Sequence, residues 1–251
     1  MKRFATLLLF ALLGCATLSA QYNNITPAPV RVQGGVCDGD QCGVPEPFDA
    51  TRTFKLYIKG ADSADAARLE AAVSAAGLEY ERVNRIAKRD FKGAFIFINI
   101  FPESMEFDEG YAIWTDPNGV SITAKTPAGA YYALQSIRQM VEAGEWQTGL
   151  IVDYPRFEYR GALIDISRHF RSVDFLKRQI DMMARLKMNR LHLHLTDAAG
   201  WRLEIESYPR LTSYAAWRTP HDWKGWWYGD RKFVDEGTEG ASGGYLTKEE
   251  A

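Results

Sequence analysis

The residues best suited to chemistry fall in two short stretches of the sequence. Asp165–Phe170 reads DISRHF, and Leu191–Trp201 reads LHLHLTDAAGW. These stretches supply Arg168, His194 and Asp197. The planar fork of a guanidinium group binds vicinal oxygens, and a carboxylate accepts hydrogen bonds from hydroxyl groups. The three side chains therefore predict a binding site for a polar, oxygen-rich ligand.

Metal binding is a second interpretation of the same stretches. His192 and His194 are two positions apart, so on a strand their side chains point to one face. A His-x-His strand followed by an aspartate is a common start of metal hydrolases. Zinc would need a third protein ligand, and the other histidines of the chain are His169 and His221. A metal-dependent barrel hydrolase therefore stays open at this point.

A purely structural role is the third interpretation. His192 and His194 would then be hydrogen-bonded residues of a barrel interior. Arg168 would form only a surface ion pair, with Asp165 or Asp174 as its partner.

Aromatic residues gather further along the chain, interspersed with charged residues. They are Trp217, Trp223, Trp226, Trp227 and Tyr228. Aromatic faces with a few polar partners are typical of binding sites for ligands such as sugars. The segment is either part of a carbohydrate site, as in a non-catalytic carbohydrate-binding fragment, or a loop held in place by buried tryptophans. Trp201 is expected to pack rather than to bind a ligand.

The elements that must position these residues form a βαβ unit. Ala162–Ile166 reads as a strand, a helix begins after Ser172 and stops near Asn189, and Leu191–Leu195 reads as the next strand. A strand, a helix of this length and a strand place the two strands parallel and adjacent. Functional residues gather at the carboxyl ends of parallel strands. We therefore expect Arg168, His194 and Asp197 to converge.

The preceding segment, from about Asn24 to Tyr154, has a different pattern. It alternates strands with two capped helices, so it predicts a small α+β layer domain that acts as a scaffold. The expected elements are a strand at 53–59, a helix from Asp62 or Ser63 to Gly77, a strand at 94–101, a hairpin at 111–122 and a helix from Thr126 to Gly144.

The N-terminus indicates export. Residues 1–20 combine a basic start, a short apolar run and a small-residue cleavage site, as in a secretory signal peptide. Leu12–Cys15 also resembles a lipobox, so a lipid anchor at Cys15 is the alternative. Export permits disulfides, and Cys37 and Cys42 flank a turn-rich loop that a disulfide would close.

The charge balance excludes some partners. The 251 residues contain 30 Lys and Arg against 32 Asp and Glu, so no basic field indicates nucleic acid.

Thr196–Gly244 has no clear strand period, and irregular stretches of this length are usually functional loops. Thr247 and Glu250 form a capping box just before the end, which we interpret as the first turn of a helix that continues in a longer protein.

Tyr159–Arg218 resembles the opening of the catalytic barrel of glycoside hydrolase family 20, the β-N-acetylhexosaminidases. The earlier motifs ITPAPVRV and TPAGAYYALQSIRQMV are similar to the non-catalytic domain that precedes that barrel. The resemblance implies an α+β N-terminal domain at 21–154. It also implies the first strands of an incomplete α/β (β/α)8 TIM barrel at 155–251, after a signal peptide at 1–20.

The resemblance also implies an activity. The family hydrolyses terminal non-reducing β-linked N-acetylglucosamine or N-acetylgalactosamine, without a cofactor, by a retaining mechanism in which the substrate's acetamido group is the nucleophile. Arg168 matches the arginine that binds the 3- and 4-hydroxyls, Asp197 matches an aspartate near the general acid, and His194 resembles a residue that lines the site.

The family's catalytic Asp-Glu pair is not found in this sequence. Asp235-Glu236 has no apolar strand before it, so the role is not assigned there and the catalytic residues stay unknown. The family often has a second acid after the first aspartate, where this chain has Ala198. We expect residues 1–251 alone to be inactive.

Overall fold

The computed structural model describes residues 24–38, 41–85, 92–219 and 221–251. The predicted signal peptide and Cys15 lie outside the described residues. The chain divides into two compact units. One runs to Glu158 and also includes Arg185–Lys187, and the other contains Tyr159–Ala184 and Met188–Ala251.

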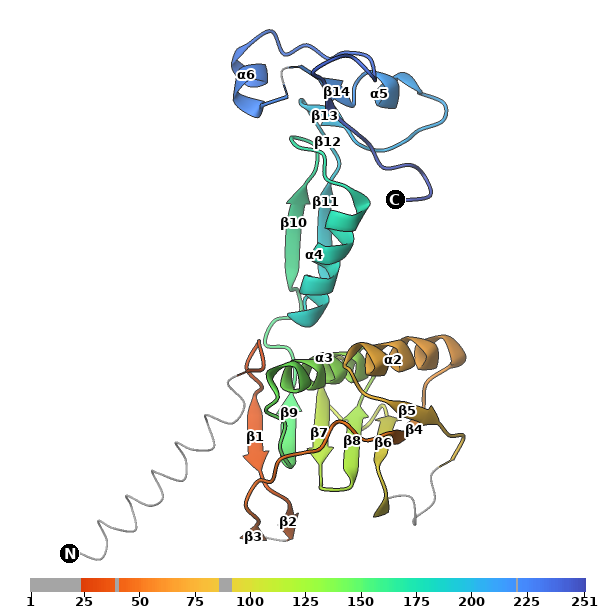
Figure 1. Cartoon of the computed structure of the whole chain (residues 1–251), viewed down its shortest axis with the longest axis vertical. Coiled ribbons are helices and arrows are strands. Elements are labelled where there is room, and N and C mark those ends of the chain that lie inside the picture. Colours follow the sequence, from red (N-terminus) through yellow and green to blue (C-terminus); the bar gives the residue numbers. More distant parts are fainter. Residues whose placement is uncertain (1–23, 39–40, 86–91, 220) are drawn as a thin grey trace, which may run out of the picture. The chain divides into compact units, whose positions relative to one another are not determined.

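The first unit is a seven-stranded mixed sheet with two helices, α2 and α3, on one face (Figure 1). The strand order is β1-β9-β7-β8-β6-β4-β5. The strands are β1 Arg31–Gly34, β4 Phe54–Lys59, β5 Tyr80–Arg82, β6 Phe95–Ile100, β7 Tyr111–Thr115, β8 Gly119–Ala124 and β9 Gly149–Asp153. This architecture is the α+β layer arrangement that the sequence predicts.

Local sequence signals explain both helices of this unit. Asp62 accepts a hydrogen bond from the Asp65 N–H at 2.8 Å and caps α2, Ser63–Ala75. Thr126 caps α3, Pro127–Ala143, which ends at Gly144 in the left-handed region with φ 66°. The strands bury alternate residues against these helices, and this alternation builds the main core.

A buried ion pair lies within the first unit. The Lys187 ammonium is 2.8 Å from an Asp153 carboxylate oxygen and 2.7 Å from the Tyr111 hydroxyl, which also lies 2.7 Å from the Ser136 hydroxyl. Burial, reinforced by the Asp153 charge, raises the pKa of Tyr111 well above its ordinary value. The Tyr111 hydroxyl therefore stays protonated and bridges the pair to Ser136.

A short hairpin in this unit carries the predicted disulfide position. β2, Cys37–Asp38, pairs with β3, Gln41–Cys42, and the register places Cys37 opposite Cys42. Cys42 is disulfide-bonded.

The second unit begins with the predicted βαβ unit. β10, Gly161–Asp165, runs parallel to β11, Arg190–His194, with α4, Val173–Arg185, between them in the chain (Figure 1). The helix is shorter than predicted: it ends at Arg185 rather than near Asn189. Lys187 adopts a left-handed φ of 58°, which ends the helical path before the asparagine is reached.

The unit formed by β10, α4 and β11 leaves large apolar side chains partly exposed. Leu163 on β10 is 59% exposed and Ile180 on α4 is 47% exposed. Among the described residues β10 and β11 pair only with each other, and a two-stranded surface is too narrow to bury a whole helix face.

The segment after β11 contains only short elements. They are β12 Thr196–Asp197, β13 Gly200–Trp201, α5 Arg210–Ser213, β14 Trp217–Arg218, α6 Trp223–Tyr228 and β15 Ser242–Gly243. Glu250 accepts a hydrogen bond from the Thr247 N–H at 2.9 Å, which is the side-chain contact of the predicted capping box. The helices that the structure describes include none that is long and apolar enough to span a membrane.

Candidate functional site

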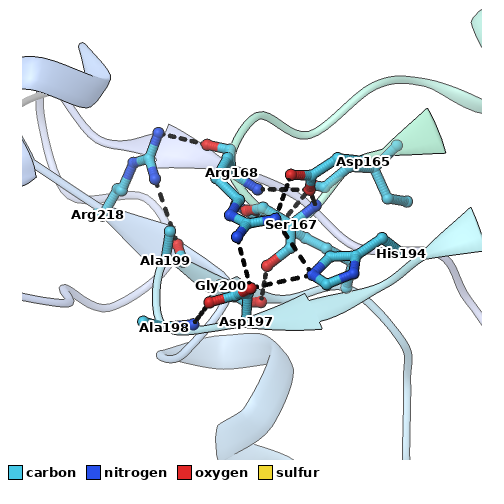
Figure 2. Close-up of polar contacts among 11 residues, drawn as sticks. Asp165, Ser167, Arg168, His194, Asp197, Ala198, Ala199, Gly200 and Arg218 are labelled. Atoms are coloured by element: carbon cyan, nitrogen blue, oxygen red, sulfur yellow. Dashed lines mark hydrogen bonds and ion pairs between the residues drawn. The ribbon is translucent and has the colours of Figure 1, made fainter. Parts of the chain in front are cut away.

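Four polar side chains form one network at the ends of β10 and β11 (Figure 2). Arg168 Nη1 lies 2.6 Å from Asp165 Oδ2, and Arg168 Nη2 lies 2.8 Å from Asp197 Oδ2. His194 Nε2 is 3.1 Å from the same Asp197 oxygen and 3.4 Å from Arg168 Nη1. The structure thus brings together the three residues that the sequence singled out, and adds Asp165.

The backbone explains why these residues meet. Asp165 is the last residue of β10 and lies opposite His194, the last residue of β11, in the parallel register. Asp165 Oδ1 accepts hydrogen bonds from the N–H groups of Ser167 and Arg168 at 2.8 and 3.1 Å. An aspartate that binds the backbone two residues ahead turns the chain, so Arg168 folds back over the strand end.

Asp197 reaches the network from the tight β12–β13 hairpin, in which it is paired with Gly200. Its Oδ1 accepts a hydrogen bond from the Ala198 N–H at 2.6 Å, which leaves Oδ2 for Arg168 and His194. One carboxylate therefore fixes both the guanidinium and the imidazole.

Both carboxylates are ionised at neutral pH. The Ala198 N–H, the His194 side chain and the Arg168 charge hold the pKa of Asp197 below its ordinary value. Burial alone would raise the pKa of Asp165, but the backbone N–H and guanidinium of Arg168 outweigh it and lower that pKa. Arg168 thus lies between two anions that fix its orientation.

The network is open to a ligand. The side chain of Arg168 is 40% exposed, and those of Asp197 and His194 are 32% and 28% exposed. An oriented and partly exposed guanidinium is suited to bind neighbouring oxygens of a solute.

The described residues do not support a metal centre. They contain no group of three His, Cys, Asp or Glu side chains placed to hold a metal ion. His192 is exposed on β11. The imidazole of His194 contacts the side chains of Asp197 and Arg168.

Asp235 and Glu236, the adjacent acids that sequence reasoning set aside, have other neighbours. Asp235 is 3.9 Å from Arg210, and both side chains are largely exposed. The Glu236 N–H donates to the Ser213 carbonyl at 2.8 Å. These contacts place the pair on an exposed turn.

The aromatic segment combines packing with exposure. Trp226 is buried and donates from Nε1 to the Lys232 carbonyl at 2.9 Å. Trp223 and Trp227 stack on each other with ring centroids 5.1 Å apart, and Tyr228 is largely exposed. Trp201 donates to the Leu203 carbonyl, as expected for a packing residue.

Sequence reasoning missed two buried arginines next to the network, Arg202 and Arg218. Nothing in their immediate sequence distinguishes a buried arginine from the exposed Arg210 or Arg231. Their burial depends on contacts with carbonyls far away in the chain, which a local pattern does not reveal.

The fold and the network are those of an α/β protein that binds a ligand at the carboxyl ends of its parallel strands. An α+β unit precedes a parallel βαβ unit, and an oriented guanidinium lies at the carboxyl ends of the parallel strands, where α/β proteins bind their ligands.

Comparison with known proteins gives the family. The model of "Glycosyl hydrolase family 20, domain 2" matches residues 22–154, and that of "Glycosyl hydrolase family 20, catalytic domain" matches residues 157–251. The chain belongs to glycosyl hydrolase family 20.

Curated relatives agree with this assignment. The chain is 34% identical over 199 residues to an N,N'-diacetylchitobiase of Vibrio harveyi. The match covers 76% of this chain and 20% of the relative. It is 38% identical over 141 residues to a β-hexosaminidase of Porphyromonas gingivalis, covering 52% of this chain and 18% of the relative. The chain therefore spans about a fifth of the length of these relatives.

Solved structures show the same likeness. A mutant Streptomyces plicatus β-hexosaminidase in complex with the product GlcNAc is 32% identical, with a TM-score of 0.65, and the match covers 91% of this chain and 42% of the other. An exo-β-N-acetylglucosaminidase of Vibrio harveyi in complex with N-acetylglucosamine is 26% identical, with a TM-score of 0.65, over 91% of this chain and 33% of the other.

Proposed function

We propose that the protein containing this chain hydrolyses terminal, non-reducing, β-linked N-acetylhexosamine residues of glycans. The observation that carries the proposal is the match of residues 157–251 to the catalytic domain of family 20, because the same residues form the Arg168–Asp197 network. The substrates are glycans that end in N-acetylglucosamine or N-acetylgalactosamine. The first is favoured by the ligands named for the two solved structures.

The reaction is a substrate-assisted hydrolysis with retention at the anomeric carbon. The carbonyl oxygen of the substrate's acetamido group attacks the anomeric carbon, and a general acid protonates the departing oxygen. Water then opens the cyclic intermediate, with the same protein group acting as base. The Asp-Glu pair for these steps is not assigned to any residue of this chain.

The chain's own residues bind and orient the sugar. Arg168 binds neighbouring hydroxyls with its guanidinium fork, which Asp165 and Asp197 hold in place through ion pairs of 2.6 and 2.8 Å. Asp197 also tunes the electrostatic environment of the general acid, and His194 lines the site beside it.

The proposal also includes the boundaries of the two domains and the compartment in which the protein acts. Residues 21–154 form the non-catalytic domain and residues 155–251 begin the barrel. The protein is exported to the periplasm or beyond, through a signal peptide at 1–20 or a lipid anchor at Cys15.

The test is an assay of the whole protein that contains residues 1–251. Purified protein should release 4-nitrophenol from the N-acetyl-β-glucosaminide or the N-acetyl-β-galactosaminide. An α-linked N-acetylglucosaminide is the control and should not be cleaved. If the folded protein cleaved neither of the two β-linked substrates, the proposal would be contradicted.

A further inference from the structure

Two buried cations lie next to the candidate site. Arg202 and Arg218 are 1% and 2% exposed, although charged side chains are rarely buried unless they are paired. Among the described residues neither has a carboxylate within ion-pairing distance. Their guanidinium groups bind backbone carbonyls instead.

Arg202 connects three separate segments. Its Nε and Nη2 donate to the Ser167 carbonyl at 3.2 and 2.8 Å, and its Nε also donates to the Ile166 carbonyl at 3.0 Å. Its Nη1 donates to the carbonyls of Ala216 and Gly244. Arg202 therefore fixes the chain immediately before Arg168.

Arg218 holds Arg168 itself. Its Nη2 donates to the Arg168 carbonyl at 2.5 Å, and its Nη1 lies 3.4 Å from the Ala199 carbonyl (Figure 2). The Arg168 N–H is held by Asp165 at 3.1 Å, so both backbone polar groups of Arg168 have fixed partners. Fixing the backbone at both ends limits where the guanidinium can point.

The aromatic segment fixes Arg218 in turn. The guanidinium carbon of Arg218 is 5.3 Å from the Trp223 ring centroid and 5.4 Å from that of Trp226, which is the range of cation–π attraction. Asp222, just before α6, provides a favourable charge. The tryptophans therefore act on the strand end through Arg218.

The arrangement is costly if its only purpose is stability. Arg218 Nε is buried and has no hydrogen-bond partner among the described residues. A buried donor without a partner lowers stability, and apolar residues of similar volume often replace buried charges without loss of stability. The contacts that an apolar side chain would not supply are the hydrogen bonds to the carbonyls of Arg168 and Ala199.

We propose that Arg218, supported by Arg202, is a positioning residue that fixes the main chain of Arg168 so that its side chain reaches the sugar. This inference rests on the proposed function. It makes the Arg218–Trp223–Trp226 contact part of the binding machinery, although none of the three needs to touch the substrate.

The test is Arg218→Lys in the whole protein that contains this chain. A lysine keeps the charge but lacks the planar fork that spans two carbonyls. Because Arg168 contacts hydroxyls that do not react, we expect KM to rise about 3- to 10-fold while kcat stays within about 2-fold. Arg231→Lys is the matched control: Arg231 lies 4.1 Å over Trp227 in the same segment but does not contact Arg168. The control should match the wild type.

A double-mutant cycle separates positioning from general stability. If Arg218 acts through Arg168, Arg218→Lys should add no further loss when Arg168 is already alanine. A loss of equal size in both backgrounds, or unchanged kinetics in folded Arg218→Lys, would overturn the proposal. Should Arg218→Lys fail to fold, Trp223→Leu removes one aromatic contact of Arg218, and unchanged KM in that variant would overturn the proposal instead.

A binding measurement distinguishes failure of this inference from failure of the proposed function. Calorimetric titration with N-acetylglucosamine needs no turnover. Binding by the wild type that weakens in Arg218→Lys supports positioning even if hydrolysis is absent. Hydrolysis with no difference between the variants overturns positioning alone, and a wild type that neither binds nor cleaves overturns both.

Discussion

Arg168→Ala is the substitution with the largest expected effect on substrate binding. It removes the guanidinium held 2.6 Å from Asp165 and 2.8 Å from Asp197, and leaves those two carboxylates facing each other without a cation between them. Hydrogen bonds to charged groups contribute about 1.5–3 kcal/mol each. The loss of one such contact to the sugar lowers kcat/KM by about 10- to 100-fold, since about 1.4 kcal/mol corresponds to tenfold.

The assay is hydrolysis of the chromogenic N-acetyl-β-glucosaminide by the whole protein, with KM and kcat determined separately. The loss should fall mainly on KM, because the hydroxyls that Arg168 binds do not take part in bond breaking. Arg210→Ala is the matched control, since Arg210 is 72% exposed and its nearest acid is 3.9 Å away. Unchanged kinetics in a folded Arg168→Ala variant would refute the reasoning and reduce Arg168 to a surface ion-pair partner.

Three further predictions concern the network, the core and the chain. Asp197→Asn should weaken the network at neutral pH. The pKa of Asp197 in the folded protein lies below its ordinary value of 3.8. The variant should therefore be less stable to unfolding than the wild type above that pH, and the difference should vanish as the pH falls through the folded pKa. A difference that stays constant in melts at acid pH would contradict this. Lys187→Met leaves Asp153 buried without its cation and should lower the free energy of unfolding by about 3–5 kcal/mol in urea titrations, whereas Lys125→Met at an exposed pair should change it little. A polypeptide of residues 1–251 should not turn over the chromogenic substrate, because general acid catalysis contributes about 10²–10⁴-fold and no residue here is assigned to it; robust turnover would bring Asp235 and Glu236 back as candidates.

The elements that the sequence predicts well have local causes. Asp62, Thr126 and Gly144 mark the ends of α2 and α3 because caps and a left-handed glycine act within one turn of a helix. The parallel pairing of β10 and β11 follows from the length and handedness of the connection between them. These signals suffice to place Arg168, His194 and Asp197 at one edge.

The features that the sequence does not predict depend on distant contacts. The early end of α4 reflects the left-handed Lys187, whose ammonium is buried against Asp153, 34 residues earlier in the chain. Ile180 fits a helical stripe, yet its exposure depends on how much sheet lies beneath it. Arg202 and Arg218 are buried because carbonyls from four separate stretches, at 166–168, 199, 216 and 244, converge on them, and no periodicity encodes that convergence.

The most direct test of the central claim compares two substrates of the whole protein that differ only in the group on carbon 2. We expect hydrolysis of 4-nitrophenyl N-acetyl-β-glucosaminide and no detectable hydrolysis of 4-nitrophenyl β-glucoside, because the acetamido oxygen is the nucleophile and a hydroxyl cannot replace it. Comparable rates for the two substrates, or cleavage of the glucoside alone, would contradict a family 20 mechanism for the protein that carries this site.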